Sequence, residues 1–164
     1  MKTSSLNERF SLGASLLENA VADLTAEQWI AAPGPGNWSI AEVVVHLLDC
    51  DLVYADRMKR IVAEESPALL AFDQDSWADR LHYAKLPGAD AAALFGSHRR
   101  WMTVLLRSWS ESDFGRAGMH SEVGRQTLAE VVAKVVTHLD HHLRFIYAKR
   151  ANLGISVVPK YANE

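Results

Sequence analysis

The chain has 164 residues, 17 Lys and Arg against 20 Asp and Glu, a net charge of −3 and a single cysteine. This length suits one domain with one core, and without a basic surplus we expect no nucleic-acid partner. One cysteine excludes both an internal disulfide and a thiolate zinc cluster, and no apolar run is long enough to span a membrane. We therefore expect a cytoplasmic protein in which any metal is held by His, Asp or Glu.

Residues 5–24 have the pattern of a first amphipathic helix. Its apolar side chains recur at helical spacing, and Ser5 with Glu8 would form a capping box at the start. Gly13 lies inside this segment, where glycine lowers helix propensity slightly. We predict that the helix tolerates it.

A second capping box, Thr25 with Gln28, predicts a single helical turn before residues 33–36, whose Pro-Gly-Pro-Gly sequence no regular helix can cross. The second long helix is then expected over residues 39–64. Ser39 supplies its N-cap, and a glutamate three residues later completes the box.

Three side chains of this second helix are candidates for chemistry. His46 lies at the edge of the apolar stripe, beside Cys50. Cys50 is interpreted mainly as a small buried hydrophobe and secondarily as an extra metal ligand. Asp51 lies near the centre of the stripe, where an unpaired carboxylate would be costly, so we expect it to accept hydrogen bonds from a metal-bound histidine or another polar group. If it supports a ligand, Asp51→Asn should weaken metal affinity by about 10- to 100-fold and leave the fold largely intact.

Residues 65–88 form a long connection with a short helix over 76–83, and a third long helix is predicted over 90–109. The side chains expected to point inward from the third helix are Leu94, Phe95, Trp101, Met102, Leu105 and Leu106. His98 falls within this set and is interpreted as a core or cleft histidine that could also support a metal site. Residues 110–126, which include His120, are expected to be a loop.

The most informative segment is the last helix, over residues 127–154. Thr127 and Glu130 form its capping box, and a glycine provides its stop. At about 100° per residue, His138 and His142 share one flank of the apolar stripe, while His141 turns toward solvent.

An HxxxH pair on a half-buried helix face places two imidazoles where they can bind one transition metal. Taken alone, such a pair is more often a feature of an amphipathic face than a metal site. A third ligand reverses this interpretation, and His46 lies at a compatible depth in a facing antiparallel helix. We therefore predict a site formed by His46, His138 and His142, with an open position that faces a pocket at the end of the bundle where residues 33–38 lie.

Four long amphipathic helices without strand alternation predict an all-α four-helix bundle. The first and third links allow antiparallel neighbours, and the long second link allows helices two and three to run parallel, so the expected order is up-down-down-up. Residues 1–154 would form one domain and residues 155–164 a C-terminal tail.

Three motifs resemble the DinB-like (DinB/YfiT) superfamily. They are NWSIAEVVVHLLDCD at 37–51, HSEVG at 120–124 and HLDHHLRFI at 138–146. The resemblance implies the same bundle, frequently as a homodimer, with a divalent metal held by one histidine of the second helix and two of the fourth. Those positions correspond to His46, His138 and His142.

The resemblance also implies a metal-dependent enzyme acting on a small molecule, either a hydrolase or a transferase or isomerase that uses a low-molecular-weight thiol. Three neutral imidazoles leave a coordination position open, as catalytic sites do. A non-catalytic metal-binding or stress-related protein and a purely structural bundle remain the alternatives. A His₃ site accepts Zn, Ni, Fe, Co or Mn, so the sequence leaves the metal unidentified.

Overall fold

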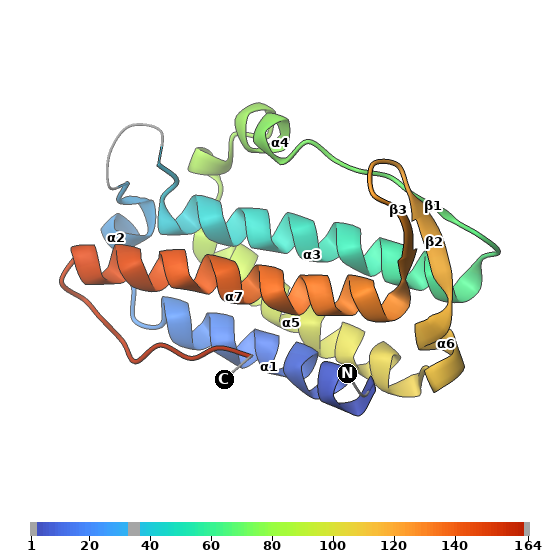
Figure 1. Ribbon diagram of the computed structural model, residues 1–164. Helices are drawn as coiled ribbons and strands as arrows, with labels where there is room; N and C mark the ends of the chain where they lie inside the picture. Colours follow the sequence, from blue (N-terminus) through green and yellow to red (C-terminus); the bar gives the residue numbers. More distant parts are fainter. Residues whose placement is uncertain (1–2, 33–36, 163–164) are drawn as a thin grey trace.

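Four long helices run side by side in the computed structural model, which describes residues 3–32 and 37–162 (Figure 1). They are α1 (Thr3–Val21), α3 (Ile40–Ala63), α5 (Gly88–Ser108) and α7 (Leu128–Asn152). Helices α3 and α5 run opposite to α1 and α7. The predicted all-α bundle and its up-down-down-up order are therefore confirmed.

Helices α1 and α3 lie at opposite corners of the bundle, and so do α5 and α7. Both α1 and α3 pack mainly against α5 and α7. The connections over residues 22–39 and 109–127 are long enough to cross the bundle end, so they do not join neighbours as the link lengths had suggested. The antiparallel neighbours are instead α3 with α7 and α1 with α5. This arrangement sets the helix of His46 beside that of His138 and His142.

Local capping signals fix three of the helix starts. The boxes at Thr25, Ser39 and Thr127 are all formed, and the first opens α2 (Ala26–Ile30). The box predicted at Ser5 is wrong, because α1 already begins at Thr3 and Ser5 lies within it. The predicted boundary at 33–36 lies outside the described residues.

The connections hold several short elements. The short helix predicted over 76–83 is present as α4, although it covers Gln74–Arg80. The sequence pattern did not predict β1 (Ala68–Leu69), a 3-10 turn (Tyr83–Lys85), α6 (Glu111–Gly115), β2 (Ala117–His120) or β3 (Gly124–Thr127). Strand β2 lies between β1, which is parallel to it, and β3, which is antiparallel. The expected loop over 110–126 is therefore largely a short helix and a hairpin. His120 is buried there, and its Nδ1 accepts the backbone N–H of Glu122, which closes the turn.

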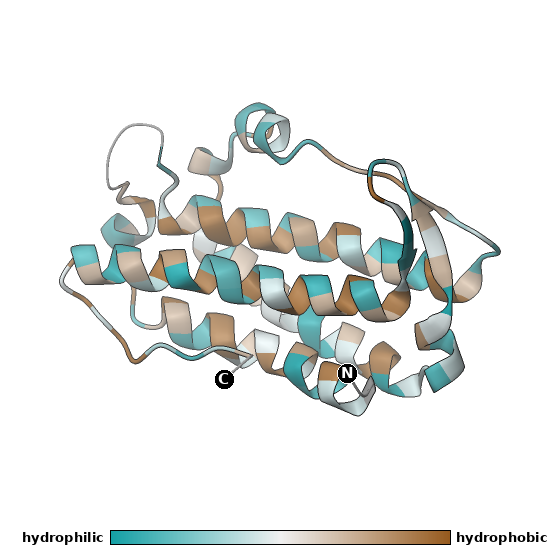
Figure 2. Ribbon diagram, in the orientation of Figure 1, coloured by the Kyte–Doolittle hydropathy of each residue, from teal (hydrophilic) through white to brown (hydrophobic). Residues whose placement is uncertain are grey.

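Hydrophobic and hydrophilic residues alternate along the long helices, as amphipathic packing requires (Figure 2). In α5 the buried positions include Phe95, Arg99 and Met102, whereas Leu94 and Trp101 are 54% and 58% exposed. The expectation that these last two point inward is wrong. The inward stripe contains a charged residue, Arg99, which a search for apolar spacing overlooks.

The segment after α7 folds back along the bundle (Figure 1). Arg150 donates a hydrogen bond from Nε to the Ile155 carbonyl, and the Ala162 N–H donates to the carboxylate of Asp140. Ala162 is itself buried. The predicted tail thus contacts the last helix. Within the described residues, no helix has the length and apolar character needed to cross a membrane.

Gly13 has a packing role. A Cβ atom built on it would lie 2.7 Å from Arg99 Nη1 and 3.2 Å from Leu139 Cδ2. The Arg99 guanidinium cannot swing aside freely, because Asp51 binds its Nε and its Cζ lies 4.2 Å from the centre of the Phe10 ring. Glycine allows this close approach of α1.

Gly13→Ala should therefore lower the free energy of unfolding by about 1–3 kcal/mol through overpacking, despite a gain in helix propensity of about 1 kcal/mol. Gly115→Ala is the matched control, since its Cβ would meet nothing within 4 Å. Urea unfolding of both variants measures the effect. Equal stability of the two would contradict the packing role.

Candidate metal centre

Three histidines from two helices meet inside the bundle. His46 comes from α3, and His138 and His142 come from successive turns of α7. The Nε2 atom of His138 lies 3.3 Å from Nε2 of His46 and 3.1 Å from Nε2 of His142. The centres of the His46 and His142 rings are 4.7 Å apart. All three rings thus present the same nitrogen toward one region.

These separations fit the binding of one metal ion. Two nitrogen ligands about 2.0–2.1 Å from a tetrahedral zinc ion lie roughly 3.3–3.4 Å apart. The two measured Nε2–Nε2 distances, 3.1 and 3.3 Å, are close to that value. Two of the three ligand pairs therefore already have the spacing that one ion requires.

The protonation of the cluster also suits a metal. Burial, together with the neighbouring imidazoles, lowers the pKa of His138 to about 4 and that of His142 to about 3. Burial lowers the pKa of His46 as well, although Asp49 and Asp75 oppose the shift. Near neutral pH the three rings are therefore uncharged, which is the form that binds metals.

Cys50 lies next to this cluster. Its Sγ is 3.5 Å from His46 Nε2, and one ligand atom from each of His46, Cys50 and His138 falls within 4.8 Å of the others. The thiol is buried, and burial raises its pKa to about 12. In the absence of a metal it is a protonated, packed side chain, which agrees with its interpretation as a small buried hydrophobe.

Asp51 has two polar partners behind the cluster. Its 3% exposed carboxylate accepts a hydrogen bond of 2.6 Å from Arg99 Nε and one of 2.8 Å from His98 Nδ1. The expected buried acceptor is therefore present. Its partners come from α5, and the structure shows no hydrogen bond from Asp51 to His46, His138 or His142 among the described residues.

Arg99 is the residue that the sequence analysis missed. It is 2% exposed, and its Cζ lies 4.2 Å from the centre of the Phe10 ring and 5.0 Å from that of Phe95. Burial lowers the pKa of Arg99, and Asp51 opposes this shift. The four-residue spacing from Phe95 to Arg99 was the available signal, because it puts the cation on the inward face of α5.

The cluster reaches the surface along α7. His138 and His141 line a hollow of about 490 Å³ with Ala133, Lys134 and Thr137. His141 is exposed, as expected, and its ring centre lies 5.2 Å from that of His142. A pocket had been expected where residues 33–38 lie. There, Trp38 covers His46, with ring centres 5.1 Å apart, and residues 33–36 are not described.

Comparison with known proteins agrees with this picture. The sequence model of the DinB superfamily matches residues 9–146. A protein of Bacillus licheniformis named "Putative metal-dependent hydrolase" is 33% identical over 141 residues, which cover 85% of this chain and 80% of that protein. A relative of the same description from Oceanobacillus iheyensis is 33% identical over 132 residues, or 80% and 76% of the two chains.

Among solved structures, YfiT from Bacillus subtilis superposes with a TM-score of 0.85. The match covers 94% of this chain and 89% of YfiT at 24% sequence identity. That structure is described as having "an unusual four-helix bundle topology". The similarity supports the fold described above.

The pairing of Asp51 with Arg99 predicts a large effect of substitution. Asp51→Asn should lower the free energy of unfolding by about 3–5 kcal/mol, because it leaves the buried guanidinium without its counter-charge. The sequence-based expectation that this variant leaves the fold largely intact is therefore revised. Asp56→Asn, which breaks only an exposed pair with Arg60, should cost less than about 1 kcal/mol. Urea unfolding that gave similar losses for both variants would contradict the role of Asp51.

The lowered histidine pKa values predict a pH dependence for the metal-free protein. Below pH 6.5 His138 and His142 bind protons in the unfolded chain, whereas both stay neutral in the folded protein because their pKa values are lowered. The stability present above pH 6.5 should therefore be lost progressively as the pH falls toward 4. Urea unfolding at pH 7 and pH 5 measures this loss. It should be smaller when both residues are changed to Gln, and an unchanged pH slope in that variant would argue against the assignment.

Proposed function

Because this chain belongs to the DinB superfamily and brings three histidines together, we propose that it binds one divalent metal ion through His46, His138 and His142 and acts as a metal-dependent hydrolase on a small molecule. The observation that carries the proposal is the convergence of three Nε2 atoms at distances of 3.1 and 3.3 Å. The names of the relatives support the reaction class.

The residues of the site have distinct roles in this proposal. A bound divalent ion would supply Lewis acidity and lower the pKa of a water or thiol beside it. His46, His138 and His142 hold the ion from two rigid helices. His141 is exposed and lines the hollow beside His138. Asp51 and His98 lie behind the ligands and fix the position of α5 against α3.

In this proposal the nucleophile comes from solution. The Cys50 thiol is buried with its pKa raised to about 12, and burial also raises the pKa of the neighbouring Tyr54. Neither residue is therefore available as an ionised nucleophile near neutral pH. Water suits a hydrolase, and the thiol-dependent transfer implied by the resemblance would need a low-molecular-weight thiol as a second substrate. We also propose that the chain forms a homodimer, as the family resemblance implies.

Replacement of single histidines tests the ligand set. His142→Ala should weaken metal binding by more than roughly 100-fold, since even the loss of a residue that supports a ligand costs 10- to 100-fold. His141→Ala is the matched control and should change metal affinity little. Elemental analysis and chelator-competition titration measure both, with circular dichroism to check the fold.

Metal loading should also stabilise the wild-type protein, by about 2.7 kcal/mol when free metal is one hundred times the Kd. His142→Ala should lose this stabilisation and His141→Ala should keep it. Equal metal binding by the two variants would refute the assignment. If the wild-type protein bound no stoichiometric metal after incubation with metal ions, the proposal would be wrong and the purely structural bundle would be favoured.

A further inference from the structure

A second cavity lies on the other side of α3 from the bundle core. It encloses about 720 Å³ between the helix and the connection that carries β1 and α4. Its apolar walls are formed by Leu52, Val53, Leu70, Phe72 and Trp77. Leu52 and Leu70 are 42% and 72% exposed, and the rings of Phe72 and Trp77 lie 4.8 Å apart. This apolar surface has no cover among the described residues.

Three of the four charged side chains that line the cavity have partners. Arg60 bonds to Asp56 and also to Glu64, one turn further along α3. Asp49 accepts a hydrogen bond from the Tyr83 hydroxyl. These interactions satisfy both carboxylates and one cation of the lining.

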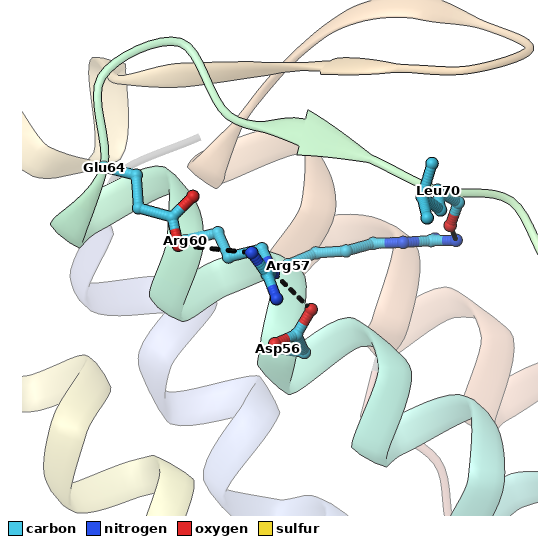
Figure 3. A network of polar contacts seen from close by, with 5 residues as sticks. All are labelled: Asp56, Arg57, Arg60, Glu64 and Leu70. Atoms are coloured by element: carbon cyan, nitrogen blue, oxygen red, sulfur yellow. Dashed lines mark hydrogen bonds and ion pairs between the residues drawn. The ribbon is translucent and has the colours of Figure 1, made fainter.

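Arg57, the fourth charged side chain of the lining, is less well satisfied. It is 4% exposed, yet no carboxylate lies within 4.0 Å of it among the described residues. One Nη atom donates to the Leu70 carbonyl, its Nε is buried without a hydrogen-bond partner, and its Cζ lies 5.0 Å from the centre of the Tyr54 ring. In Figure 3, Arg60 turns toward Asp56 and Glu64, whereas Arg57 extends to Leu70.

Burial of a cation without a counter-charge is unfavourable because the cation loses its hydration, and an anion bound beside it would offset that loss. A guanidinium is suited to a carboxylate because it can donate two parallel hydrogen bonds. The apolar walls, in turn, favour a ligand with a hydrophobic body. The cation and the apolar walls together therefore suit a molecule that has both a carboxylate and an apolar body.

We propose that this cavity binds a small carboxylate with an aromatic or other apolar body, its acidic group on Arg57 and its body against Leu52, Phe72 and Trp77. None of the proposed metal ligands lines the cavity. The binding site is thus separate from the metal centre, and the proposal does not rest on the proposed function.

Two probes that differ only in charge test the proposal. 1-Naphthylacetate carries the anion, and 1-naphthylacetamide has the same aromatic body without it. Calorimetric titration of the purified full chain should show the acetate binding at least about 10-fold more tightly than the amide. Arg57→Met should abolish this preference and leave the affinity for the amide nearly unchanged.

Arg60→Met is the matched control, since Arg60 lines the same cavity but already has partners, and it should keep the preference. Arg57→Lys retains the cation and should keep part of the preference for the acetate. This variant keeps the test decisive if Arg57→Met does not fold. Phe72→Ala should weaken the binding of both probes. His142→Ala should bind them as the wild type does, so failure of the metal assignment would not affect this test.

Three results would overturn the proposal. The wild-type protein could bind both probes equally or bind neither. Arg57→Met could weaken both probes by the same factor, which would indicate that Arg57 only holds Leu70 in place. Arg60→Met could abolish the preference as fully as Arg57→Met does, which would indicate a general surface charge effect.

Discussion

The buried pair of Asp51 and Arg99 is the interaction on which the arrangement of the bundle depends. It joins α3 to α5 at a point where both side chains are almost fully buried, and His98 adds a second bond to the same carboxylate. A buried ion pair contributes little net stability compared with apolar packing, but loss of either member is expensive. Alternative registers between α3 and α5 would separate the charges. The pair therefore favours one alignment of α3, the helix that carries His46, against α5.

Much of this fold could be predicted because its signals are local. The capping boxes at Ser39 and Thr127 and the apolar periodicity of the long helices need no tertiary information. The histidine cluster was also accessible, since the one-turn spacing of His138 and His142 fixes their common direction and only the facing residue, His46, had to be found across the bundle.

Other features depend on contacts between distant residues. The strands have two to four residues each, too few for an alternating pattern, and β1 pairs with a strand about fifty residues away. Arg99 was missed because the inward positions were identified from apolar residues alone. Its burial depends on two distant residues, since Gly13 leaves space for the guanidinium and Asp51 neutralises its charge. Leu94 and Trp101 were assigned inward for the same reason, since the stripe was fitted to apolar residues alone.

The strand pairing between two of the connections has a consequence for motion. The N–H groups of Met119 and Ser121 donate to the carbonyls of Pro67 and Leu69, so the connection after α3 and the one before α7 are held by shared backbone bonds. Neither can separate from the bundle without breaking bonds to the other. Their amides should consequently share one opening free energy in hydrogen exchange, as parts of a single cooperative unit at that end of the molecule.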